Sequence, residues 1–164
     1  MIIDFNPVAG QYPGLGTRGS GEMAYYMEDQ VRKNWNHFNT PHTSGGHTRD
    51  LLNSLTEVFW ECADQNWDGH GAAPITLQTV CNACRLIETL PVHLAQAEIA
   101  PEPDGQLAFE WHHNSKRTLS VSVSPDGDLH FAALLGARKI YGTEPFTGSL
   151  PKTIADLIKQ IQPA

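Results

Sequence analysis

The sequence contains no apolar run long enough to cross a membrane. A membrane-spanning helix needs about 20 consecutive apolar residues, and polar residues interrupt every apolar stretch of the 164-residue chain well before that length. The first residues, Met1 to Asp4, also lack the charged and long apolar regions of a secretory signal peptide. We therefore expect a cytoplasmic protein.

Basic residues are scarce. The chain has 11 Lys and Arg against 18 Asp and Glu, which gives a net charge of -7. Several of the cations occur as short pairs, Arg32-Lys33, Lys116-Arg117 and Arg138-Lys139, and none forms a long basic stretch. Binding to a phosphate backbone depends on many such cations, so we do not expect nucleic acid to be the partner. The net charge favours a protein partner with a basic surface.

Cysteines are also few. Cys62, Cys81 and Cys84 are an odd number of thiols, and a chain without an export signal is expected to keep them reduced. Cys81 and Cys84 form a C-x-x-C pattern, but both lie on the apolar side of a helical pattern and no second such pair follows. We therefore predict buried thiols that pack as small apolar groups, and no zinc site.

Two other patterns resemble ligand sites but lack the required surroundings. Residues 14–19 spell G-x-G-x-x-G without a preceding apolar strand, so they do not predict dinucleotide binding. His37, His42 and His47 recur at five-residue intervals with no carboxylate at a known metal-binding spacing. We expect exposed histidines there, a pH-dependent partner contact being the alternative, and no cofactor or metal anywhere in the chain.

The N-terminal region, residues 1–47, differs in composition from the remainder. Glycine and proline concentrate on both sides of one amphipathic helical pattern at 22–36. Tyr25, Tyr26 and Trp35 add apolar area to this pattern, so we expect the helix to contact its own domain, a partner or a second copy. The prediction is an arm (1–47) followed by one domain (48–164). Self-assembly through residues 22–38 is one alternative function.

Three further helices are predicted in the domain. Thr48 is a candidate cap for the first helix, where Glu57, Glu61 and Asp64 share the face opposite the apolar stripe. Such an acidic row is either a solvated helix surface or a docking strip for a basic partner. Caps and breakers also mark a second helix that starts at Thr76 and ends at Leu90-Pro91, and a C-terminal helix after Pro151.

Alternating apolar residues predict strands at 107–111, 119–123 and 129–133, with a further short strand at 138–141. The turn sequences Pro-Asp-Gly at 103–105 and at 125–127 favour tight hairpin connections. We therefore predict an α+β fold in which a three- to four-stranded antiparallel meander has helices packed on one face.

The opposite face of this predicted sheet carries small and polar residues. Pairing through the two turns makes Ala108, Ser122 and His130 neighbours, with Glu110 in the adjacent row and His112 further along. Glu110, Ser122 and His130 are the one place where an acid, a nucleophile and a base converge, so a small hydrolase or metal-binding enzyme is an alternative function. A flat sheet offers no cleft and no oxyanion hole, which weighs against it.

Two sequence motifs occur together. Residues 67–76 read W-D-G-H-G-A-A-P-I-T, and residues 101–111 read P-E-P-D-G-Q-L-A-F-E-W. This pair resembles a loose group of small uncharacterised bacterial and mobile-element proteins, over about residues 50–135. The resemblance implies a fold but no activity. In physical terms the first motif predicts a turn anchored by Trp67, in which Asp68 accepts backbone amides and Glu110 can bond back to the turn. The alternative is that Asp68 and Glu110 help to form a binding site.

The sequence favours a non-enzymatic function. We predict an acidic protein-binding module that inhibits or regulates another protein, and a mobile-element factor of the anti-defence or antitoxin type is a specific version of this hypothesis. The residues assigned to partner binding are the acidic, aromatic and imidazole side chains singled out above: Glu57, Glu61, Asp64, Tyr25, Tyr26, Trp35, Asp68, His70, Glu110, His112 and His130.

Overall fold

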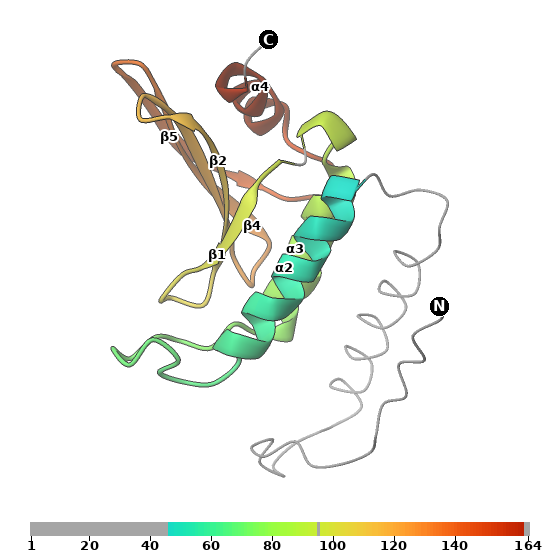
Figure 1. Ribbon diagram of the computed structural model, residues 1–164, viewed down its shortest axis with the longest axis vertical. Helices are drawn as coiled ribbons and strands as arrows, with labels where there is room; N and C mark the ends of the chain where they lie inside the picture. Colours follow the sequence, from blue (N-terminus) through green and yellow to red (C-terminus); the bar gives the residue numbers. More distant parts are fainter. Residues whose placement is uncertain (1–45, 95, 163–164) are drawn as a thin grey trace.

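The computed structural model describes residues 46–94 and 96–162 of the chain. These residues form an α+β fold in which one antiparallel sheet carries the helices on a single face (Figure 1). The helix predicted at 22–36 and its partner-binding candidates Tyr25, Tyr26 and Trp35 lie outside the described residues. Within the described residues no helix combines the length and the apolar character that a membrane span requires.

Two of the three α-helices begin where the sequence signals predicted, after Thr76 and after Pro151. Thr76 caps the second helix, because its side-chain oxygen accepts a hydrogen bond from the Thr79 N–H at 3.2 Å. Thr48 is not a cap: the first helix already begins at Gly46, two residues before the predicted domain boundary. The helical elements are α2 (Gly46–Cys62), α3 (Leu77–Thr89), the short 3₁₀ turn η1 (Val92–Leu94) and α4 (Lys152–Ile161).

The sheet is a five-stranded meander, so the prediction of three to four strands was too low. The strand that the sequence missed is β1, whose four residues Glu-Ile-Ala-Pro are too few to display an alternating pattern. The predicted strand at 138–141 is confirmed and continues to Pro145. In spatial and chain order the strands are β1 (Glu98–Pro101), β2 (Leu107–Asn114), β3 (Arg117–Val123), β4 (Asp128–Leu135) and β5 (Arg138–Pro145).

The register confirms the predicted pairing across the sheet. Ala108 lies opposite Ser122, and Ser122 lies opposite His130. Glu110, Ser120 and Ala132 form the adjacent row. Both Pro-Asp-Gly turns are tight hairpins, whose glycines Gly105 and Gly127 have φ of +87° and +90°. Side chains of one parity therefore face the helices, and those of the other parity form what we call the outer face.

The core lies between the sheet and the three helices. Phe109 and Trp111 of β2 are buried beneath them, and the Trp111 Nε1–H donates to the Leu94 carbonyl at 2.9 Å, which satisfies the one polar atom of the ring. Burying each such side chain contributes about 1.5–3 kcal/mol. α4 adds Ile154, Leu157 and Ile158 to the same core. The helices thus cover one face of the sheet, and its turns lie at two opposite ends.

Candidate functional site

One end of the sheet is acidic. A meander places alternate turns at the same end, so the turn at 102–106, the turn at 124–128 and the end of β5 lie together. No lysine or arginine occurs in these segments. We call this group the acidic end; its carboxylates are Glu102, Asp104, Asp126, Asp128 and Glu144.

The other end of the sheet is basic. It holds the turns at 115–116 and 136–137, which the Gly136 N–H joins by donating to the Lys116 carbonyl at 2.7 Å. Arg117 and Arg138 both lie opposite Leu135, one strand to either side of it. None of the cations at this end has an ion-pair partner within the part of the chain that the structure describes. We call this group the basic end; it consists of Lys116, Arg117, Arg138 and Lys139.

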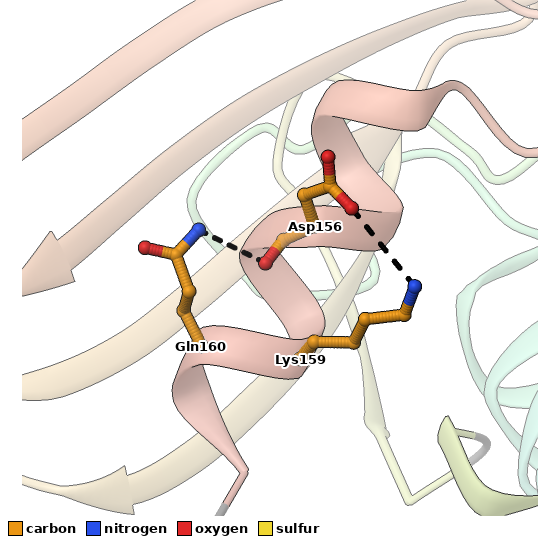
Figure 2. Close-up of polar contacts among 3 residues, drawn as sticks. All are labelled: Asp156, Lys159 and Gln160. Atoms are coloured by element: carbon orange, nitrogen blue, oxygen red, sulfur yellow. Dashed lines mark hydrogen bonds and ion pairs between the residues drawn. The ribbon is translucent and has the colours of Figure 1, made fainter.

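The C-terminal part of α4 lies beside the basic end. Gln160 lines an open hollow of about 350 Å³ together with Arg117 and Arg138. Gln160 donates from Nε2 to the Asp156 carbonyl at 3.0 Å, and the Asp156 Oδ1 lies 3.9 Å from the Lys159 Nζ. Both contacts are drawn in Figure 2. The carboxylate of this helix is therefore engaged within α4, and the two arginines keep their charge toward solvent.

The acidic end is braced against α3. The Asn82 side chain is buried and donates from Nδ2 to the carbonyls of Ser124 and Pro125 at 3.1 and 3.0 Å. Thr79 donates from its hydroxyl to the Gly105 carbonyl at 3.3 Å. One helix thus holds both Pro-Asp-Gly turns, which fixes the positions of the carboxylates that they carry.

Residues 63–74, the larger part of the connection between α2 and α3, form a loop that adjoins the acidic end. The Ala73 N–H donates to the Pro103 carbonyl at 2.8 Å, which joins the loop to the β1–β2 turn. Trp67 anchors the loop as predicted: its ring is partly buried and its Nε1–H donates to the Ala73 carbonyl at 2.9 Å. This bond replaces the predicted one from Glu110, which makes no hydrogen bond to the loop among the described residues.

Asp68 organises the centre of this loop. Its Oδ1 accepts the N–H groups of His70 at 2.8 Å and Ala72 at 3.0 Å. These two backbone bonds hold the pKa of Asp68 below its ordinary value, because they stabilise the charged carboxylate. The adjacent Gly69 and Gly71 have φ of +74° and +97°. Asp68 is therefore ionised at neutral pH, in the loop that adjoins the acidic end.

Two of the three predicted acidic residues of the first helix lie on it. Glu57 and Glu61 are exposed and separated by one helical turn on α2. The expectation that Asp64 shares their face is wrong, because α2 ends at Cys62 and Asp64 lies in the 63–74 loop. The chain passes from the end of this helix directly into the loop that adjoins the acidic end.

The outer face of the sheet carries the remaining candidates. Glu110 lies opposite Glu98 on β1, and His112 lies opposite Thr118 on β3. His130 is opposite Ser122, but its Nδ1 lies 2.9 Å from the Thr143 hydroxyl and not against Glu110. The hydrolase hypothesis stays a prediction, and these three residues do not form one cluster with the loop.

The thiols occupy the interior. Cys62, Cys81 and Cys84 are buried, and burial raises the pKa of each, that of Cys84 to about 12. The reactive and metal-binding form of cysteine is the thiolate, so these groups are protonated at neutral pH. Within residues 46–94 and 96–162, no three His, Cys, Asp or Glu side chains are arranged to hold a metal ion.

The sequence predicted part of the acidic surface but not that the turn carboxylates lie together at one end of the sheet. It selected Asp68 and the helix carboxylates but none of the turn carboxylates, such as Asp126. The available signal was the repeated Pro-Asp-Gly turn, since alternate turns of a meander share an end.

The resemblance of the two motifs to mobile-element proteins stays a prediction. Comparisons of the chain with models of protein families, with curated proteins and with solved structures find no match.

Proposed function

We propose that the protein is a non-enzymatic, acidic binding module that inhibits or regulates another protein by covering a basic surface on it. The docking surface is the acidic end together with the 63–74 loop. The observation that carries this proposal is the gathering of turn carboxylates at one end of the sheet, in segments that contain no lysine or arginine.

Charge separation along the sheet supports an oriented encounter. A basic target is attracted to the acidic end and repelled by Lys116, Arg117 and Lys139 at the basic end. Complementary potentials of this kind accelerate association and select the docking orientation more than they increase affinity. The expected interaction is therefore fast, oriented and weakened by salt.

The bracing of the acidic end supports a preformed binding surface. Asn82 and Thr79 hold the two turns from α3, and the 63–74 loop is closed by its own hydrogen bonds. A surface that is ordered before binding loses less conformational entropy when the partner docks. We therefore expect the turns to keep their conformation in the complex.

The test is capture of a target with matched charge variants. One variant carries Asp104→Asn, Asp126→Asn and Asp128→Asn, which removes three charges from the acidic end and keeps the side-chain shapes. Its counterpart carries Lys116→Gln, Arg117→Gln and Lys139→Gln at the basic end. Proteins retained from host lysate by wild type are identified, purified and measured for association rate.

We expect the acidic-end variant to associate about tenfold more slowly at low salt. The basic-end variant should bind at least as fast as wild type. Circular dichroism and thermal unfolding establish that both variants are folded. A target whose association rate is equal for wild type and the acidic-end variant would contradict the proposed surface, as would a target lost only from the basic-end variant.

A further inference from the structure

Strand β5 is the last strand of the sheet that the described residues form. It is eight residues long, and within the described part of the chain it pairs only with β4. Its other side has no strand partner in residues 46–94 and 96–162, and the backbone N–H and C=O groups of such an edge are a template for another strand. The last strand also carries Tyr141 on the outer face, where 83% of its surface is exposed.

The side chains of β5 are self-complementary in one antiparallel register. Two copies of a sheet that pair around a two-fold axis must keep outer face with outer face, which restricts the partners to residues of equal parity. Arg138 and Glu144 have equal parity and lie near opposite ends of the strand. A register centred on Tyr141 places Arg138 of each copy opposite Glu144 of the other.

Proline and lysine residues on an edge strand usually prevent it from pairing with another chain. In this register neither kind of residue blocks the pairing of β5. Pro145 has no N–H and would interrupt pairing inside a ladder, but here it falls beyond the partner strand, opposite Ala137 of the second copy. Lys139 meets the neutral Thr143 of the second copy. Moving the centre by one residue, to Gly142, removes both Arg138–Glu144 pairs.

We infer that the protein forms a two-fold symmetric dimer in which the β5 strands of two copies pair antiparallel, centred on Tyr141, to give one continuous sheet. This interface shares Glu144, at the end of β5, with the docking surface proposed above, and the charge variants that test that surface leave Glu144 unchanged. Two Arg138–Glu144 pairs flank the axis, and the two Tyr141 rings meet on the outer face. The arrangement also places the basic end of each copy beside the acidic end of the other, which stabilises the pair electrostatically.

The interface is small. Pairing along seven residues of each strand buries less than the area of a standard stable interface, so we expect a dissociation constant on the order of 100 µM. Sedimentation equilibrium over a concentration series that reaches about 1 mM measures it. Wild type that remains monomeric throughout the series would overturn the dimer.

Charge exchange tests the register. Arg138→Glu and Glu144→Arg each place like charges opposite one another twice, so each should weaken dimerisation by about tenfold or more. The double variant Arg138→Glu/Glu144→Arg recreates both pairs and should recover wild-type association. If dimerisation were limited only by the overall repulsion between two acidic chains, Glu144→Arg would strengthen the dimer, because that variant has a smaller net negative charge.

A dimer strengthened by Glu144→Arg, or not recovered in the double variant, would overturn the proposed register. Thermal unfolding of each variant separates lost pairing from lost folding. If one single variant does not fold, the double variant and the other single variant still decide the result.

Cross-linking tests the centre of the register independently. Tyr141→Cys places two thiols directly opposite, within the Cα separation that a disulfide spans, while the native thiols are buried. Lys139→Cys is the matched control, because its two copies are four strand positions apart, about 13 Å. Mild oxidation should cross-link Tyr141→Cys at least about tenfold faster. Equal rates, or faster cross-linking of Lys139→Cys, would contradict a centre at Tyr141.

Discussion

The two ends of the sheet are built from the same kind of element and are held in different ways. At the acidic end, α3 grips both Pro-Asp-Gly turns through Asn82 and Thr79, and the 63–74 loop adds a backbone bond to Pro103. At the basic end, the two hairpin turns are joined to each other through Gly136 and Lys116, and the neighbouring helix contributes Gln160 beside an open hollow.

This difference indicates where the fold places its rigidity. Buried side-chain bonds from a helix fix a turn more firmly than contacts between exposed hairpins, because each broken bond leaves a buried polar group unsatisfied. The acidic end is therefore the better preorganised surface. The predictions below test the contrast, and they are ordered from the largest expected effect to the smallest.

Replacing Asn82 should have the largest effect on stability. Asn82→Ala removes the donor to two carbonyls, those of Ser124 and Pro125. We expect a loss of about 2–3 kcal/mol in the free energy of unfolding, measured by urea denaturation. Asn53→Ala, at an exposed position of α2, is the matched control for helix propensity and should stay within about 0.5 kcal/mol of wild type. Equal losses in the two variants would show that α3 does not brace the turns.

Matched glycine substitutions compare the ends directly. Gly105 at the acidic end has φ of +87°, and an added Cβ would lie 3.1 Å from the Pro74 carbonyl oxygen. Gly136 at the basic end has φ of +68° with no atom within 4 Å of that position. We expect Gly105→Ala to cost about 2–3 kcal/mol and Gly136→Ala about 1 kcal/mol by denaturant unfolding. The reverse order would mean that the basic end is the more tightly packed.

The smallest effect concerns acid stability at Asp68. Backbone amides lower the pKa of this carboxyl in the folded protein, so its stabilising contribution is present above the ordinary pKa of 3.8 and is lost as the pH falls through the lowered value. The stability difference between wild type and Asp68→Asn should therefore shrink on acidification. Unfolding curves from pH 6 to about pH 2 measure it. Asp64→Asn in the same loop is the control. If its stability difference from wild type shrinks equally on acidification, the effect does not come from the hydrogen bonds of Asp68.

Local patterns predicted most of the fold. The alternation of apolar and polar residues predicted β2, β3 and β4 in the correct register. Helical periodicity, with Thr76 and Pro151 as start signals, located α3 and α4. The failures have physical causes. β1 has too few residues to show a period, and Thr48 lost its role as a cap because the helix extends one turn further toward the N-terminus.

The candidate site was less predictable. Asp68 was recognised because its loop is local and closes on itself. The turn carboxylates were not recognised, and Lys116-Arg117 and Arg138-Lys139 were interpreted as isolated basic pairs. Their grouping depends on which turns share an end of the sheet, a property that appears only once the number and order of strands are known.

Short-range chemistry in the chain was sufficient to specify the helices, the hairpin turns and the apolar face, since each depends on residues within a few positions of one another. Only the folded meander decided that acids gather at one end, that bases gather at the other, and that Arg138 and Glu144 share a face of the last strand. Strand pairing is a long-range event, and it places residues that are distant in sequence beside one another.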